Sequence, residues 1–225
     1  MKNQKPKVFK KEIRNREIRM ARQSSASEAI GRLEKGMDVF ILTFGQFSLI
    51  EALGVILDQT GSADVDFATW TANDAHLERA GGLMEAANIR RLRMVVDHSF
   101  EGRQPGSCYH MRKLFGDECI RSVRTHAKFM VVRSEGWNVV VRTSMNLNEN
   151  PRLENIEISE SKAFADFFVE VVDGIFAEVD EGERRSRMLE LPGLPDNYPF
   201  KEVEGRQIRR ETVNEPKVTH TIKKL

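Results

Sequence analysis

Cysteine and long apolar runs are scarce in this 225-residue chain, and each absence excludes a class of protein. The two cysteines, Cys108 and Cys119, are too few for a disulfide framework or a four-ligand zinc site, which favours a reducing, cytoplasmic setting. No apolar run approaches the roughly 18 residues of a membrane span, and the Lys-rich start lacks the apolar stretch of a secretory signal. We therefore expect neither integral membrane association nor Sec export. A glycine-rich nucleotide loop is also missing.

Net charge is small as well, at +1, but this total averages three unequal segments. Residues 2–22 hold nine Lys and Arg against two Glu, and residues 201–225 hold seven basic against four acidic side chains. The remaining segment, 23–200, has a net charge of −9. An acidic body with a basic arm at each end is suited to binding a polyanion such as DNA through the arms. The candidate phosphate contacts in the first arm are Lys10, Lys11 and Arg14.

The same changes in composition predict three segments along the chain. We expect residues 1–23 to form a basic N-terminal arm, either mobile or an inducible helix, because its like charges repel at helical spacing. Residues 24–182 are expected to form the folded domain. Residues 183–225 are expected to form a polar and basic tail, since Pro192, Pro195 and Pro199 favour extended chain.

The folded domain alternates short apolar runs with amphipathic stretches, which predicts an α/β fold: a mixed β-sheet flanked by helices on both faces. The aromatic stripe of the last helix is expected to face the core. Only residues 133–136 separate the fourth and fifth strands, so we expect a hairpin there. The expected strands are 37–43, 63–71, 91–96, 122–132, 137–144 and 155–159, and the expected helices are 48–59, 73–87, 109–115 and 162–179.

This hairpin is expected to gather four polar groups. His126 and Lys128 are two residues apart on its first strand, so period-two alternation places both on one face. Ser144 ends the partner strand, and Asn146 follows two residues later on the same side. An imidazole can attack phosphorus, an ammonium can neutralise phosphate oxygens, and hydroxyl and amide donors can complete an anion cradle, with no metal or other cofactor. Glu157 on the next strand is the candidate carboxylate for holding the imidazole tautomer.

Three short motifs resemble the signature of the phospholipase D superfamily, in which H-x-K is followed by G-S-x-N and then by N-x-E. They are His126-Ala127-Lys128, Thr143-Ser144-Met145-Asn146 and Asn155-Ile156-Glu157. The resemblance covers about residues 24 to 180 and implies a phospholipase D-like domain that works as a metal-independent phosphodiesterase or phosphatidyl-type transferase through a phosphohistidine. It implies these roles: His126 as nucleophile, Lys128, Ser144 and Asn146 as phosphate ligands, Glu157 as the partner that orients His126, and Asn155 as a substrate contact.

The chain departs from this signature in copy number and at two positions. Arg133 and Thr143 stand where the family has Asp and Gly. The family's site uses two H-x-K motifs, because one His attacks while the other protonates the leaving oxygen, and this chain has one. The resemblance therefore implies a homodimer with one His126 from each subunit in a shared site.

The leading hypothesis is a metal-independent nuclease or DNA phosphodiesterase. The first alternative is a catalytically weak or inactive phospholipase D-like protein that binds DNA or supports an assembly. A second is a phospholipid-directed hydrolase or transferase that uses the basic arms at an anionic membrane surface. Asp97 and His98, at the end of the third strand, are candidates for the rim of the site. Trp70 and Trp137 are assigned to the core or the hairpin, although an exposed Trp could stack a base.

Overall fold

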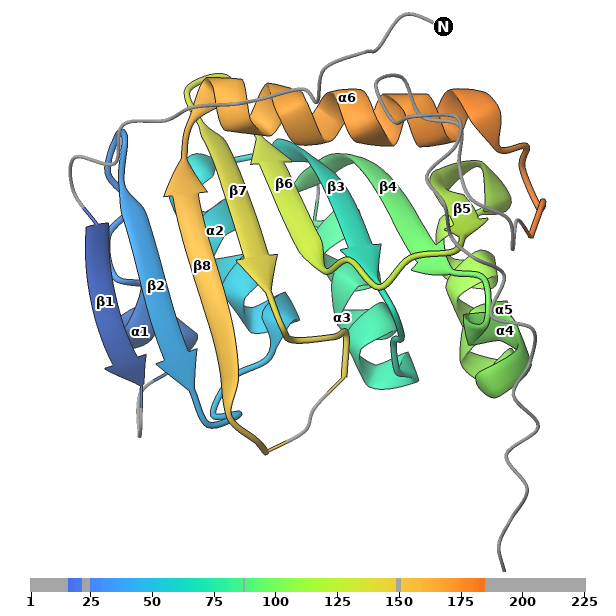
Figure 1. Cartoon of the computed structure of the whole chain (residues 1–225), viewed down its shortest axis with the longest axis horizontal. Coiled ribbons are helices and arrows are strands. Elements are labelled where there is room, and N and C mark those ends of the chain that lie inside the picture. Colours follow the sequence, from blue (N-terminus) through green and yellow to red (C-terminus); the bar gives the residue numbers. More distant parts are fainter. Residues whose placement is uncertain (1–15, 22–24, 87, 149–150, 185–225) are drawn as a thin grey trace, which may run out of the picture. The chain divides into compact units, whose positions relative to one another are not determined.

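The computed structural model describes residues 16–21, 25–86, 88–148 and 151–184, which form an eight-stranded mixed sheet with helices on both faces (Figure 1). All lie in the compact unit Met1–Leu194, and the second unit, Pro195–Leu225, is outside the described residues. The strands are β1 (Arg16–Ala21), β2 (Asp38–Thr43), β3 (Ala63–Thr69), β4 (Ile89–Asp97), β5 (Ile120–Val123), β6 (Phe129–Arg133), β7 (Asn138–Thr143) and β8 (Glu154–Glu160). The helices are α1 (Ala26–Ile30), α2 (Leu49–Thr60), α3 (Asp74–Glu85), α4 (Phe100–Arg103), α5 (Pro105–Phe115), the short 3-10 helix η1 (Asp117–Cys119) and α6 (Lys162–Glu178).

The sheet has the strand order β1-β2-β8-β7-β6-β3-β4-β5. Three strand pairs are parallel, β1 with β2, β3 with β4, and β4 with β5, while β6, β7 and β8 pair antiparallel with their neighbours. The directions of these strands bring the carboxyl ends of β1–β5 and β7 to the same edge as the starts of β6 and β8. The loops at this edge follow the carboxyl ends of six strands or precede the starts of β6 and β8. The candidate site lies among these loops.

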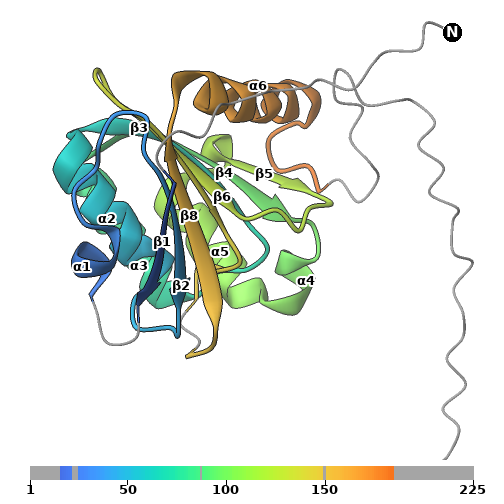
Figure 2. The same ribbon diagram turned by 60° about the vertical axis from the view of Figure 1, so that its left-hand side comes forward.

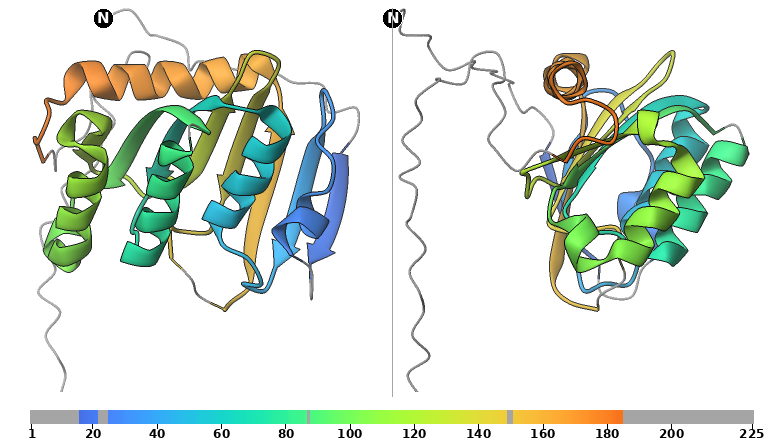
Figure 3. Two further views of the ribbon diagram at one scale, coloured as in Figure 1. Left: turned by 180° about the vertical axis from the view of Figure 1, so that it is seen from behind. Right: turned by 90° about the vertical axis from the view of Figure 1, so that its right-hand side faces the viewer.

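Two apolar layers hold the helices against the sheet (Figures 2 and 3). The larger layer packs α1–α3 and α5 on one face, with fully buried Leu53, Leu77 and Met111. The smaller layer packs α6 on the other face, where Val172 and Ile175 are buried and the Phe168 ring lies 4.6 Å from that of Phe129. The expectation that the aromatic stripe of this helix faces the core is therefore confirmed.

Side-chain caps explain where several helices begin. Ser25 and Glu28 form a capping box at the start of α1, and Ser48 and Glu51 form another at the start of α2, each with reciprocal side-chain to backbone hydrogen bonds. Asn73 accepts a hydrogen bond from the backbone of His76 at the start of α3. These polar residues precede apolar segments in the sequence, which is why the helix positions were predictable.

The α/β class, the hairpin and most elements are as expected, but the strand predicted over 122–132 is wrong. The structure has two strands there, β5 and β6, joined by the loop 124–128. The reason is topological: β5 pairs with β4 at the sheet edge, while β6 pairs with β3, so the chain must pass the ends of β3 and β4 between them.

A second correction concerns the arm. Arg16–Ala21 form the edge strand β1, parallel to β2, where a mobile segment or an inducible helix was expected. Arg19 donates hydrogen bonds to the carbonyl oxygens of Ala29 and Ile30, and Arg16 forms an ion pair with Glu157. Like-charge repulsion is relieved because these cations find carboxylate and carbonyl partners on the folded domain.

Candidate functional site

The candidate site is where the loop 124–128 meets the chain that leaves β7. The backbone N–H of Thr143 donates to the carbonyl oxygen of Lys128 over 3.2 Å, which extends the β6–β7 ladder by one bond beyond the start of β6. The H-x-K segment and the Ser144 segment therefore lie side by side, as the hairpin predicted. His126 and Lys128 themselves are in the loop and not on the strand, so the strand alternation invoked for them does not apply.

His126 and Lys128 nevertheless approach each other closely. The Lys128 Nζ atom lies 3.2 Å from His126 Nδ1 and donates to the His126 carbonyl oxygen over 3.1 Å. His126 is exposed and Lys128 is half-buried. Burial lowers the pKa of Lys128, an effect that the negative charge of Glu154 opposes and the positive charge of Arg152 reinforces. An ammonium in this setting has lost part of its hydration and has room for an anion as a further ligand.

Ser144 is held by the first residues of β8. Its Oγ donates to the carboxylate of Glu154 and accepts from the backbone N–H of Asn155 over 3.0 Å, while its own N–H donates to the Asn155 carbonyl oxygen over 3.1 Å. Thr143, at the family's Gly position, donates from Oγ1 to the same carbonyl oxygen over 2.6 Å. Thr143 therefore anchors the turn that presents Ser144.

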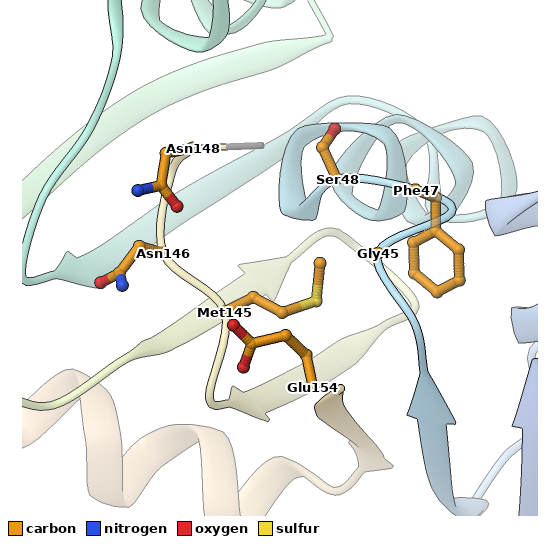
Figure 4. Close-up of a pocket in the computed structure, with 7 residues that line it drawn as sticks. All are labelled: Gly45, Phe47, Ser48, Met145, Asn146, Asn148 and Glu154. Atoms are coloured by element: carbon orange, nitrogen blue, oxygen red, sulfur yellow. The ribbon is translucent and has the colours of Figure 1, made fainter. Parts of the chain in front are cut away.

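Asn146 lies in a small pocket at this edge of the sheet (Figure 4). Its side chain is buried, with 6% of its surface exposed, and its Oδ1 atom has no hydrogen-bond partner among the described residues. The neighbouring Leu147 exchanges backbone hydrogen bonds with Thr71 and Asn73, which fixes this segment beside the end of β3. The pocket is lined by Gly45, Phe47, Ser48, Met145, Asn146, Asn148 and Glu154.

Glu157 is not where its expected role requires it. Its carboxylate forms ion pairs with Arg16 and, over 2.7 Å, with Arg142. Alternation along β8 puts Glu157 on the face that carries α6, whereas Glu154, Ile156 and Ile158 point to the opposite face. The expected contact between Glu157 and His126 is therefore corrected: Glu157 is a structural partner of two arginines.

Glu154 is the carboxylate that the sequence reasoning missed. It is 9% exposed, it accepts a hydrogen bond from Ser144 and from Arg152, and its charge reaches Lys128. The pairing rule for antiparallel strands could have found it, because the first residue of β8 must lie opposite the residues that follow the end of β7. The N-x-E spacing predicted Glu157 as the carboxylate of the site instead.

Asp97, the last residue of β4, holds the loop 124–128 by a hydrogen bond, in agreement with its expected place at the rim of the site. Its carboxylate accepts from the backbone N–H of Thr125 over 3.1 Å and from the backbone and side chain of Ser99. Burial alone would raise the pKa of Asp97, but these hydrogen bonds outweigh it and hold the pKa below the ordinary aspartate value. Its charged form therefore fixes the residue that precedes His126.

The remaining predicted residues fall into two groups. Asn155 contributes its backbone to Ser144 and Thr143, as described above, and is next to Glu154 on β8. Lys10, Lys11 and Arg14 lie outside the described residues, so their predicted phosphate contacts stay predictions. Arg133, which stands at the family's Asp position, is at the far end of β6, where its guanidinium lies 3.1 Å from Asp166 of α6.

No group of three or more His, Cys, Asp or Glu side chains in the described part of the chain is arranged to hold a metal ion. None of the helices described is long and apolar enough to cross a membrane.

No protein-family model and no curated protein matches this sequence. Several solved structures are similar to it in fold, among them the following two. Polyphosphate kinase from Porphyromonas gingivalis aligns with 61% of this chain and 26% of its own, at 12% identity and a TM-score of 0.43. A phospholipase D family member, Nuc from Salmonella typhimurium, aligns with 58% of this chain and 90% of its own, at 16% identity and a TM-score of 0.41. Both likenesses are too distant to transfer an activity, so any function must be inferred from the site's own residues.

Proposed function

We propose that this protein is a phosphodiesterase of the phospholipase D type that cleaves nucleic acid, chiefly DNA, through a phosphohistidine. The observation that carries the proposal is the convergence of two loops at one edge of the sheet. The hydrogen bond between Thr143 and Lys128 aligns H-x-K with the Ser144 turn, and Glu154 contacts that turn from β8. An exposed imidazole and a partly desolvated ammonium then lie beside the segment that carries a hydroxyl, and this set suits a phosphodiester. The expected phosphate contact of the Asn146 amide stays a prediction.

The proposed reaction has two steps. A lone pair of the exposed His126 imidazole attacks phosphorus, a P–N bond forms, and the P–O bond to the leaving group breaks while that oxygen takes a proton from a second imidazole. Water then attacks the phosphohistidine, gives its proton back to that second imidazole, and the P–N bond breaks. Lys128 binds the non-bridging oxygens, and the Ser144 hydroxyl joins it by turning its single proton from Glu154 to the phosphate. Glu154 positions Ser144, and its negative charge acts on Lys128. This role differs from the one expected of Glu157, which was to orient the His126 imidazole.

The second imidazole is proposed to come from another copy of the chain, in a site shared across a homodimer. The support is that His126 is the one histidine followed two residues later by Lys. Among the described residues, His76 is 1% exposed, His110 Nε2 lies 3.6 Å from Glu78 of α3 and His98 Nδ1 lies 4.0 Å from Asp97. None of these three histidines is followed two residues later by Lys. A two-fold axis would bring a second His126 to the phosphate.

The decisive test is cleavage of supercoiled plasmid and single-stranded oligonucleotides in excess EDTA. We expect cleavage by the wild-type protein and a loss of at least about a thousandfold in the His126→Ala variant, because the nucleophile is removed. A radiolabelled phosphoryl group that is acid-labile and absent from the variant would identify the intermediate. If the wild type binds DNA but leaves it intact, the alternative reading as a binding or assembly protein replaces this proposal.

Subunit mixing tests the shared site separately. Wild type is refolded or co-expressed with increasing amounts of His126→Ala at constant total protein. If both imidazoles are needed, activity falls with the square of the wild-type fraction. A linear fall would show that each chain acts alone and would contradict the shared site while leaving the phosphodiesterase proposal standing.

A further inference from the structure

Beside His126 lies a stack of planar side chains that the proposed chemistry does not use. The ring of Trp70, just after β3, has its centroid 5.5 Å from that of His126, with 50° between the two planes. The guanidinium of Arg103, the last residue of α4, lies over the Trp70 ring at 3.8 Å from its centroid. Trp70 is half-buried and Arg103 is exposed. A planar, cationic surface therefore adjoins the candidate nucleophile.

Hydrogen bonds hold this stack in place. Arg103 donates from Nε to Ser99 Oγ over 3.0 Å and from Nη2 to the Trp70 carbonyl oxygen over 2.8 Å. Ser99 in turn donates to Asp97, whose other oxygen accepts from Thr125 beside His126. The guanidinium is thus fixed against the indole by groups that also fix the His126 loop. Its orientation is set before any ligand arrives, which lowers the entropy lost on binding.

We propose that the Arg103–Trp70 stack binds a nucleobase adjacent to the phosphodiester at His126, so that the substrate is a base-bearing nucleic acid; this inference rests on the proposed function. A guanidinium fixed on an aromatic ring stacks well on the π-face of a base, and any base offers such a face. Acyl chains and polyphosphate have no planar face to match it. Arg103 Nη1 makes no hydrogen bond among the described residues, so it is available to an acceptor such as a base edge or a flanking phosphate.

The first test uses two oligodeoxythymidylates of equal length and charge, one intact and one with an abasic tetrahydrofuran residue at every position. We expect the wild type to have a kcat/KM at least about fivefold higher on the intact strand, a lower bound for stacking of one base. Arg103→Lys keeps the charge and removes the planar face, so its rate should fall more on the intact strand than on the abasic strand, and the preference should be lost. Arg90→Lys, an exposed arginine at the opposite end of the strands, is the matched control and should keep the preference.

Two outcomes separate this inference from the proposed function. Equal cleavage of both strands by the wild type, or an equal loss on both in Arg103→Lys, would overturn the stack and leave the nuclease intact. If His126→Ala cleaves as well as the wild type, the proposed function fails instead. Base stacking on Arg103 and Trp70 is then tested by the binding experiment alone.

Binding is measured with Trp137→Phe, which leaves Trp70 as the one tryptophan in the chain. Cleavage-resistant phosphorothioate versions of the two strands are titrated and the emission of Trp70 is recorded. A saturable change with the thymidylate and none with the abasic strand supports the inference. No change with either strand, or the same change with both, contradicts it.

Discussion

The two ends of the β6–β7 hairpin carry similar kinds of charged residue but pair them differently. At the turn end, Arg133 lies 3.1 Å from Asp166, and Lys35 lies 3.5 Å from Glu160 and over the ring of Trp137. At the open end, Lys128 has His126 and a carbonyl oxygen as its nearest partners, and the buried carboxylate whose charge acts on it, Glu154, is shared with Ser144 and Arg152.

This difference separates structural charges from charges that are available to a ligand. Each cation at the turn end already has an anion or a ring beside it, so a bound phosphate would have to compete with a protein group. At the open end, Lys128 is partly desolvated and its charge is only partly neutralised. Under these conditions a bound anion contributes the most binding free energy. The same hairpin therefore links a neutralised end to the end at which we propose that an anion binds.

Exchange of a carboxylate for an amide at two positions of β8 tests the difference between available and structural charges most directly. We expect Glu154→Gln to lower kcat on a phosphodiester about a hundredfold, because Ser144 and Lys128 lose the charge that positions them. Glu157→Gln should leave kcat unchanged and lower the free energy of unfolding by about 1 kcal/mol, since its arginine partners are partly exposed. Steady-state rates and urea unfolding measure both. Similar effects of the two substitutions on kcat would contradict the assignment of Glu154.

A smaller effect is expected below the open end, at Asp97. Its pKa is depressed in the folded protein, so its charged form stabilises the fold above the unfolded-state pKa. That contribution is lost as the pH falls from the ordinary aspartate range through the lower folded-state value. Asp97→Asn should therefore cost about 1–2 kcal/mol at neutral pH and flatten the acid limb of the stability curve. Urea unfolding across that range checks this, and an unchanged acid limb in the variant would count against it.

The smallest effect belongs to the turn end. Arg133→Ala should change the free energy of unfolding by no more than about 0.5 kcal/mol, because its ion pair with Asp166 is partly exposed on both sides. Its activity should equal that of the wild type, although Arg133 occupies a position of the family signature. Thermal unfolding and initial rates measure the two quantities. A large loss of activity would mean that Arg133 at the turn end affects the site at the open end, and would contradict its purely structural role.

Patterns within short stretches of sequence were enough for much of this fold. The helical pattern over residues 48–59 predicted α2, and the four residues 133–136 predicted the hairpin of β6 and β7. The gathering of H-x-K and Ser144 followed from that hairpin alone. Each of these features depends on hydrogen bonds or periodicities that span a few residues.

Three features were beyond such patterns. The order of strands decided that 124–128 is a loop, because β5 and β6 lie on opposite sides of β3 and β4. Pairing with β2 made a strand of Arg16–Ala21, although its charges alone favoured an arm free of the domain.

The third feature is the choice of carboxylate. Sequence by itself determined the residue types of the open end, which are those of phosphodiester chemistry. Only the tertiary structure decided which carboxylate serves it, because Glu154 and Glu157 differ in the face of β8 that they occupy. Which face each side chain occupies depends on the apolar layers that pack against the two sides of the sheet.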